Sequence, residues 1–399
     1  MKLVAIGFGQ CGGKIADEFS KINARARLHR RIQILDGVFA VNSDTADLSC
    51  LSSIPSDYKH RILIGNRKTG GHGVGKKNEI GAQIASKDAD KVVEAVRSTK
   101  GFYETDAFLL IAGAAGGTGS GSLPIIAQAL KERFRDKPIY SMVVLPFEHE
   151  VKTNPKTFSN TATCLKATYS VSDAVFLVDN QRYIEKDSSL MNNMSTINKL
   201  IVEPFYDLLC AGEENKSRRI GSKVLDAGDI ISTARGWTVM GYGVWDLPAF
   251  KLRWWQQSNF KNKSTEIHKG LGAMDQAMSN LSLQCNPEDS SSVIFLVSAP
   301  KQEMSMDLVK ELADYVAEVA PNAVVRYGDY PRGENSLKIT IILSQLGAVD
   351  IVKHYYDGMP SIIQEKARRE LENERGLGEL ENASIAVPSL FNGNGNNGH

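Results

Sequence analysis

Glycine, serine and threonine are concentrated in one short segment, and residues of these types can bind phosphate. The ten residues GAAGGTGSGS (113–122) follow the apolar run AFLLI (107–111) and precede a helical pattern, LPIIAQALKERF (123–134). Small residues let backbone N–H groups approach an anion, and Thr118 and Ser120 add hydroxyl donors. The following helix directs its positive end to the same place. The segment is therefore predicted to be a phosphate-binding loop.

A second glycine-rich turn repeats this arrangement near the N-terminus. The run LVAI leads into GFGQCGG (7–13) and then into a helical pattern. The turn matches the dinucleotide fingerprint G-x-G-x-x-G, but the second strand ends late, in VNSDTADL (41–48), and lacks the acidic residue expected about 20 positions after the fingerprint. A Walker A loop fails as well, because Lys14 is followed by Ile15. Two such turns indicate one ligand with more phosphate than a single turn can hold.

Composition is that of an ordinary globular protein with room for two or three domains. Of 399 residues, 42% are apolar and 23% are charged. The 47 basic and 46 acidic residues nearly cancel, so nucleic acid is not an expected partner. The five cysteines form no CxxC pair, and no signal peptide or apolar run of about 20 residues is predicted. A cytoplasmic protein without disulfides is expected.

Short apolar strands alternate with helix-sized segments through the first half of the chain. Strands that are apolar on both faces and separated by helices predict an α/β fold with a doubly wound, mostly parallel sheet. Ligands of such sheets bind at the carboxyl ends of the strands, where both glycine turns fall. One of the helices is expected over 80–98. The predicted strands are 3–6, 38–42, 61–65, 107–113, 139–146 and 174–179.

Several motifs, in the same order, resemble those of the tubulin/FtsZ superfamily. GGTGSG (116–121) resembles its signature GGGTGSG, with Ala115 in place of the first glycine, and GQCGGKI (9–15) resembles the first tubulin loop. IGFGQCGGK, VNSDTADL, GGHGVGKKNE and GDYP most resemble the archaeal tubulin-like CetZ family, from Met1 to about residue 380. The resemblance implies a cytoskeletal protein that binds GTP, assembles head to tail with itself into filaments, hydrolyses GTP slowly and controls cell shape.

This resemblance also implies an organisation around a long central helix. The helix contains Pro204, which is expected to mark a kink. Strands at 238–245, 291–300, 322–329 and 336–346 predict a second, mixed sheet, and a charged helix is expected over 361–375. The expected parts are a GTP-binding domain at 1–187, the connecting helix at 188–212, a smaller GTPase-activating α/β domain at 213–350, a helical region at 351–383 and a disordered tail at 384–399.

By resemblance, four loops surround the GTP phosphates and a Mg²⁺ ion. Gln10 and Asp44 are expected near the metal, mostly through water, which suits a hard cation that keeps part of its hydration shell. His72 in the third loop is expected to be solvated rather than catalytic, because it lacks a positioned partner. The expected phosphate contacts are Gly9, Gln10, Cys11, Gly12, Asn42, Gly73, Val74, Gly75, Ala115, Gly116, Gly117, Thr118, Gly119 and Ser120.

The resemblance places the ribose and guanine contacts further along the chain. A carboxamide both donates and accepts hydrogen bonds, which complements guanine and rejects adenine. Glu148 is an alternative to Glu150 at the ribose, and Asn154 stands where FtsZ proteins carry an arginine. Met194 replaces an aromatic ring that often stacks on the base, and its thioether can still pack on a ring face. The expected contacts are Glu150, Asn154, Asn180, Met194 and Asn198.

Catalytic carboxylates are expected from VLDAGDI (224–230), which resembles an FtsZ loop that acts on the GTP of the next subunit. Asp226 and Asp229 would position water there, so that the active site is shared between subunits. Taken alone, the segment is more typical of a helix start capped by Asp226. Two other functions stay open: an NAD(P)-dependent oxidoreductase using GFGQCG, which leaves GGTGSG unexplained, and a nucleotide-binding scaffold that does not hydrolyse.

Two further segments are candidate contact sites. Residues 246–263, DLPAFKLRWWQQSNFKNK, combine Trp254 and Trp255 with several basic residues. They predict a lateral contact with another filament or with lipid headgroups, or equally two tryptophans buried at the base of a loop. IAVPSLF (385–391) is distantly similar to a docking peptide of FtsZ tails, and chance similarity is the favoured explanation at this length.

Overall fold

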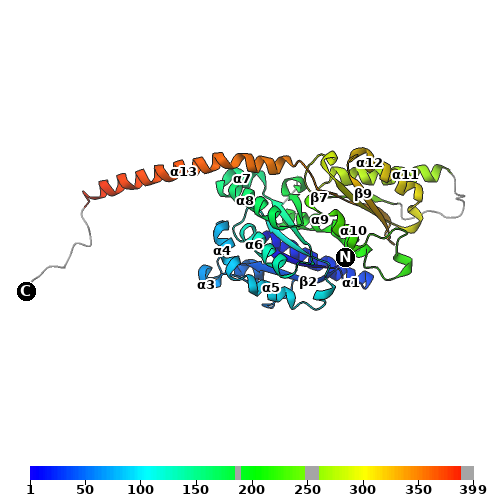
Figure 1. Cartoon of the computed structure of the whole chain (residues 1–399), viewed down its shortest axis with the longest axis horizontal. Coiled ribbons are helices and arrows are strands. Elements are labelled where there is room, and N and C mark those ends of the chain that lie inside the picture. Colours follow the sequence, from blue (N-terminus) through cyan, green and yellow to red (C-terminus); the bar gives the residue numbers. More distant parts are fainter. Residues whose placement is uncertain (185–189, 248–259, 388–399) are drawn as a thin grey trace, which may run out of the picture.

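A single ten-stranded sheet forms the centre of the computed structural model, which describes residues 1–184, 190–247 and 260–387 (Figure 1). The strands are β1 (Leu3–Phe8), β2 (Leu35–Asn42), β3 (Arg61–Leu63), β4 (Ala107–Gly113), β5 (Ile139–Leu145), β6 (Ala174–Asp179), β7 (Gly236–Asp246), β8 (Ser292–Ala299), β9 (Val324–Pro331) and β10 (Ser336–Ser344). Their order is β3-β2-β1-β4-β5-β6-β7-β10-β8-β9. Neighbours from β3 to β7 pair in parallel, and β10 lies antiparallel between β7 and β8.

The strands of the second half extend the first sheet, so the prediction of a separate second sheet is wrong. Residues 174–176 of β6 pair in parallel with residues 236–238 of β7. Without β7, β6 would present unpaired N–H and C=O groups at a sheet edge, and β7 satisfies part of that edge. Hydrophobic patterns identify strands but not their neighbours, which explains the error.

Helices cover both faces of the parallel part of the sheet (Figure 1). Leu3 and Ala5 of β1 face a core shared with α1 and α9, whereas Val4 and Ile6 face an opposite core closed by α4, α5 and α6. This alternation confirms the predicted doubly wound α/β class. The helices are α1 (Gly9–Arg30), α2 (Thr45–Ser49), α3 (Asn66–Thr69), α4 (Asn78–Lys87), α5 (Ala89–Arg97), α6 (Thr118–Arg133), α7 (Glu148–Thr153), α8 (Pro155–Val171), α9 (Leu190–Ala211), α10 (Ala227–Thr233), α11 (Phe260–Ser279), α12 (Met306–Val319) and α13 (Asp350–Ser384).

The segment expected to form one helix over 80–98 forms two, α4 and α5. Asp88 is both the C-cap of α4 and the N-cap of α5, and its carboxylate accepts a hydrogen bond from the Gly65 N–H at 2.6 Å. Because Asp favours caps over helix interiors, a tertiary contact at this residue is enough to divide the helix. In contrast, α9 runs on through Pro204.

The far end of the sheet carries a third core, which α8, α11, α12 and the first turns of α13 cover. The rest of α13 projects from the body, well beyond the predicted 361–375 segment (Figure 1). Within the described residues, no helix is both long enough and apolar enough to cross a bilayer. Trp254 and Trp255 lie outside the described residues, as do residues 388–399, so most of both candidate contact segments is not described.

Close packing of α1 against β4 depends on Gly12. A Cβ atom at Gly12 would lie 2.1 Å from the Ile111 carbonyl oxygen, a backbone atom in the middle of β4. At Gly13 the nearest atoms would be the Leu51 methyl groups, 3.8 Å away, which is ordinary contact. Gly12 therefore sets how closely the helix approaches the sheet.

We expect Gly12→Ala to lower the free energy of unfolding by about 2 kcal/mol or more, since overpacking against a fixed backbone forces the helix outward. Gly13→Ala is the matched control and should be neutral or stabilising by up to about 1 kcal/mol, the difference in helix propensity. Urea titrations of both variants measure this. Equal stability of the two would contradict the packing argument.

Candidate functional site

Two helices begin side by side at one edge of the sheet, directly after the neighbouring strands β1 and β4. Gly9, the first residue of α1, has a φ of 67°, and a Cβ there would lie 3.0 Å from the Gly119 backbone nitrogen in α6. First-turn N–H groups have no partner within their own helix, and both helix dipoles direct positive charge to this point. The arrangement suits an anion with several phosphate groups.

A cavity of about 350 Å³ lies in front of these helix ends. It brings together fourteen of the residues selected from the sequence, drawn from four glycine-rich or polar loops, from α7, from the turn after β6 and from α9. Those that line it are Gly9, Gln10, Cys11, Asn42, Asp44, Gly73, Ala115, Gly116, Gly117, Thr118, Gly119, Glu150, Asn180 and Met194. The residues expected there that do not line it are Gly12, Val74, Gly75, Ser120, Asn154 and Asn198.

Local contacts account for several residues outside the cavity lining. The Ser120 hydroxyl donates to the Gly116 carbonyl, so it points back along its own helix. Asn154 caps α8, where its side-chain oxygen accepts the Lys156 N–H at 3.0 Å. Asn198 is buried within α9. Ser120 and Asn154 are therefore engaged in local hydrogen bonds, and Asn198 is enclosed by the packing around α9.

Backbone hydrogen bonds hold the second and third loops together. The Thr45 N–H donates to the Gly71 carbonyl at 3.0 Å, and the Gly73 N–H donates to the Ser43 carbonyl at 3.1 Å. Val74 then packs into the core beside α6. His72 is exposed, as expected for a solvated side chain.

Polar side chains connect the second loop to the phosphate-binding loop. Asn42 is buried; its oxygen accepts the Ser43 N–H at 2.8 Å and its amide donates to Asp47 at 3.0 Å. The hydroxyl oxygens of Ser43 and Thr118 are 2.6 Å apart. Asp44 caps α2, with Oδ1 accepting two N–H groups of that helix. Asn42 and Asp44 thus hold the second loop in shape, and both residues also line the cavity.

Of the two candidate ribose carboxylates, Glu150 faces the cavity. Its carboxylate also accepts the Phe147 N–H at 3.0 Å, which closes the first turn of α7. Glu148 is exposed and forms an ion pair with Lys152 at 3.3 Å. Phe147 itself lines the cavity, a contact that the sequence motifs did not single out.

The sequence analysis also missed two cations in the lining, Lys14 and Lys76. Lys14 lies four residues after Gln10 in α1, so both side chains lie on the same helix face. Lys76 has a φ of 58°, a left-handed backbone that non-glycine residues rarely adopt. Both cations add to the positive field of the helix ends.

Residues near the phosphate end fit a hydrated divalent cation. Among the described residues, no group of three or more His, Cys, Asp or Glu side chains could hold a metal by itself. Gln10 and Asp44 line the same cavity and offer two oxygen atoms. A metal here would take its other ligands from phosphate and water, which is how Mg²⁺ usually binds.

The expected catalytic carboxylates lie outside this cavity. Asp226 accepts the Asp229 N–H at 2.9 Å, and Asp229 accepts the Asp226 N–H at 3.4 Å, so the pair caps α10 in both directions. Asp229 also lies 3.9 Å from Arg326, at ion-pair distance. Helix capping is therefore a real role of both residues, and both carboxylates remain accessible to solvent.

Cys11 is expected to be a poor nucleophile despite its place in the cavity. Burial, and then the negative charge of Glu150, raises the pKa of the Cys11 thiol to about 12, with Lys14 opposing the shift. Because the thiolate is the reactive form, iodoacetamide at neutral pH should modify the exposed Cys50 well before Cys11 in the folded protein. Mass spectrometry of timed digests measures both rates; equal rates would show that Cys11 ionises normally.

Comparison with known proteins identifies the family. Residues 2–186 match the Tubulin/FtsZ family GTPase domain, and residues 187–358 match the C-terminal domain of tubulin-like CetZ. The chain is 32% identical to tubulin-like protein CetZ1 of Haloferax volcanii, over 88% of this chain and 90% of the relative.

Solved structures agree with that match. The GDP-bound monomer of CetZ1 from Haloferax volcanii has a TM-score of 0.76 and 29% identity, covering 89% of this chain and 97% of that one. The GTPγS-bound protofilament of CetZ2 from the same organism has a TM-score of 0.78 and 26% identity, covering 92% and 100%. The chain therefore belongs to the tubulin/FtsZ family, as a tubulin-like protein of the CetZ type.

Proposed function

We propose that this protein binds GTP in the cavity at the ends of β1 and β4 and assembles head to tail into cytoplasmic filaments that control cell shape. The observation that carries the proposal is the meeting of two helix N-termini, at Gly9 and Gly119, in front of one cavity. Family membership supports it, since relatives of similar fold are described as a GDP-bound monomer and a GTPγS-bound protofilament.

Each part of GTP has a matching part of the cavity. The first turns of α1 and α6, with Lys14 and Lys76, would bind the phosphates. Mg²⁺, when bound beside Gln10 and Asp44, would neutralise charge on the phosphates. Glu150 would accept a hydrogen bond from the ribose. Asn180 and Met194 would then meet the base, the first by hydrogen bonding and the second by packing on the ring.

Hydrolysis needs a group that positions water, and the cavity carboxylates are already engaged. Asp47 accepts the Asn42 amide, and Glu150 closes the first turn of α7. We propose that Asp226 and Asp229 of the next subunit supply this function, so that the site is completed only in the filament. Mutual capping holds the two carboxylates at the start of α10 and would present them to that neighbour in a fixed direction. A head-to-tail contact of this kind does not close and so produces filaments.

Of the two alternative functions, the oxidoreductase is not supported, whereas the non-hydrolysing scaffold is still open. An oxidoreductase is not supported, because residues 2–358 match the tubulin-like family and the second glycine loop is part of the same cavity. A scaffold that binds GTP without hydrolysing it differs from our proposal only in turnover. Lateral or lipid contacts through residues 246–263 remain a separate hypothesis, and most of that segment lies outside the described residues.

Turnover measured with two variants tests the shared site. GTP turnover per molecule of the unmodified protein should rise steeply above a threshold protein concentration. Asp229→Asn should lower turnover by about 100-fold or more, because a water-positioning group is lost, while leaving GTP binding intact. Gly116→Asp should prevent GTP binding by placing a negative charge at the phosphates, at a position where a Cβ would meet no atom within 4 Å.

Mixing the two inactive variants should restore part of the turnover, since one supplies the nucleotide cavity and the other supplies Asp229. Gly116→Ala and the exposed Asp136→Asn are matched controls that should keep normal binding and turnover. Turnover that is flat across all protein concentrations, with no recovery on mixing, would place the catalytic group within one subunit. GTP binding without any turnover would favour the scaffold.

A further inference from the structure

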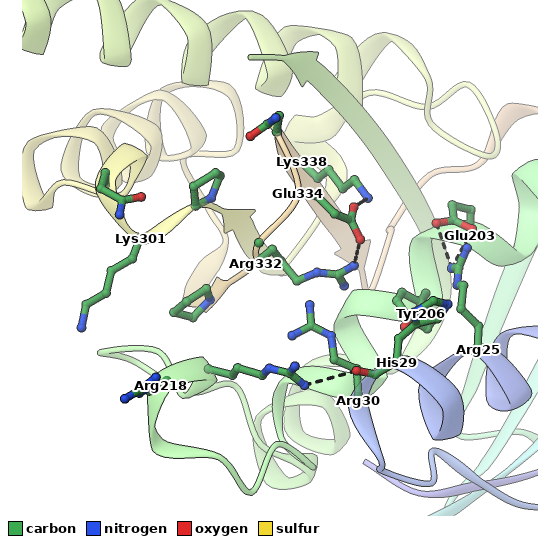
Figure 2. A pocket seen from close by; sticks show the side chains of 16 residues that line it. Arg25, His29, Arg30, Glu203, Tyr206, Arg218, Lys301, Arg332, Glu334 and Lys338 are labelled. Carbon is green, nitrogen blue, oxygen red and sulfur yellow. Dashed lines mark hydrogen bonds and ion pairs between the residues drawn. The ribbon is translucent and has the colours of Figure 1, made fainter. Parts of the chain in front are cut away.

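A second and larger cavity, of about 710 Å³, lies between the two halves of the molecule (Figure 2). It is formed by the end of α1, the middle of α9, the segment after α9, the loop after β8 and the connection between β9 and β10. It shares no lining residue with the cavity at the glycine loops. Seven Lys and Arg residues line it against two carboxylates, although the formal net charge of the whole chain is only +1.

Two of the cations on the α1 side are matched by acids of the α9 region. Arg25 donates to both oxygens of Glu203 at 2.9 Å. Arg30 is buried and lies 3.7 Å from Glu214, whose side chain is also buried. These pairs fix the two arginines in place, so their orientation does not depend on a ligand.

The connection between β9 and β10 contributes a buried arginine, Arg332, that has an unsatisfied N–H group. Arg332 forms ion pairs with Asp207 and Glu334, and Lys338 shares Glu334 at 2.5 Å. The Nε atom of Arg332 is buried and has no hydrogen-bond partner among the described residues. Burial, and then the nearby charge of Arg30, lowers the pKa of Arg332. An anion in the cavity could accept a hydrogen bond from Nε, and its negative charge would favour the charged form of Arg332.

Four of the seven Lys and Arg residues can each be paired with one of the carboxylates named above, which leaves three cations. Within the part of the chain that the structure describes, neither Arg218, Arg219 nor Lys301 forms an ion pair; Arg219 donates to the backbone carbonyl of His29 at 3.4 Å. Figure 2 shows Lys301 and Arg332 on different elements around the same open space. The cavity therefore concentrates positive charge that the protein does not neutralise.

Aromatic rings hold the guanidinium groups in a preformed arrangement. Arg25 lies over the Tyr206 ring at 3.7 Å from its centroid, and Arg332 lies 5.3 Å from the same centroid. Arg30 and Arg332 also share the Tyr330 ring, at 5.1 and 5.7 Å. Cation–π contacts stabilise charged groups that are poorly hydrated. Both rings are buried, so they offer no platform on which nucleic-acid bases could stack.

We propose that this cavity binds a small phosphate-bearing anion with at least two negative charges, separately from the nucleotide at the glycine loops. Guanidinium groups match phosphate oxygens in pairs, and a compact polyphosphate can contact cations from several elements at once. A concave site of this size suits a small molecule rather than a polymer. Because its walls come from α1 and α9 on one side and from the connection between β9 and β10 on the other, the anion bridges the two halves.

Calorimetric titration with inorganic pyrophosphate tests the proposal. The protein is saturated with GDP and kept below its assembly threshold, so that neither the glycine loops nor a neighbouring subunit competes. We expect one saturable site. Arg218→Gln/Lys301→Gln should weaken binding by at least about tenfold, which corresponds to about 1.4 kcal/mol. The control Lys353→Gln/Lys366→Gln removes two exposed charges from α13 and should leave affinity unchanged.

Repeating the titration on Gly116→Asp separates this proposal from that of GTP binding, because the variant blocks the glycine-loop cavity. Pyrophosphate should still bind it. The proposal is overturned if the unmodified protein shows no saturable binding, if both double variants lose affinity equally, or if Arg218→Gln/Lys301→Gln binds as well as the unmodified protein. Tighter binding of citrate than of pyrophosphate would overturn the phosphate assignment.

Discussion

The closeness of two glycine-led helix starts is the constraint on which the site depends. The first turn of α1 lies against β4, where a Cβ at Gly12 would meet the Ile111 carbonyl oxygen at 2.1 Å, and a Cβ at Gly9 would lie 3.0 Å from the Gly119 nitrogen in α6. Only this distance lets the free N–H groups of both helices face one cavity. A side chain at either position would push one helix away and divide the positive field between two weaker sites.

The basic and acidic residues of this protein nearly cancel in number, so its electrostatic properties depend on where the charges lie. Carboxylates near the glycine loops are occupied by caps and amide contacts, and the cations Lys14 and Lys76 face the same cavity. In the second cavity, Arg218 and Lys301 remain without ion pairs in the described part of the chain. Both cavities thus favour anions, although the chain as a whole has almost no net charge.

A residue can serve the fold and the chemistry together. Asp226 and Asp229 cap α10, which by itself explains why acidic residues stand there. The same capping fixes their direction while leaving them accessible. Asn42 and Asp44 combine roles in a similar way, because they shape the second loop and also line the cavity. Structural and catalytic explanations of these residues therefore do not exclude one another.

The sequence by itself determined the six strands of the first half, the α/β class and most of the cavity lining, because apolar runs and glycine turns are local signals. Tertiary structure decided the rest. It joined β7 to β6, divided the 80–98 segment at Asp88 and selected Glu150 over Glu148 at the cavity. It also assembled the arginine-rich cavity from five separate segments. Pairing edges, long-range hydrogen bonds and converging side chains depend on residues far apart in the chain, so no local pattern contains them.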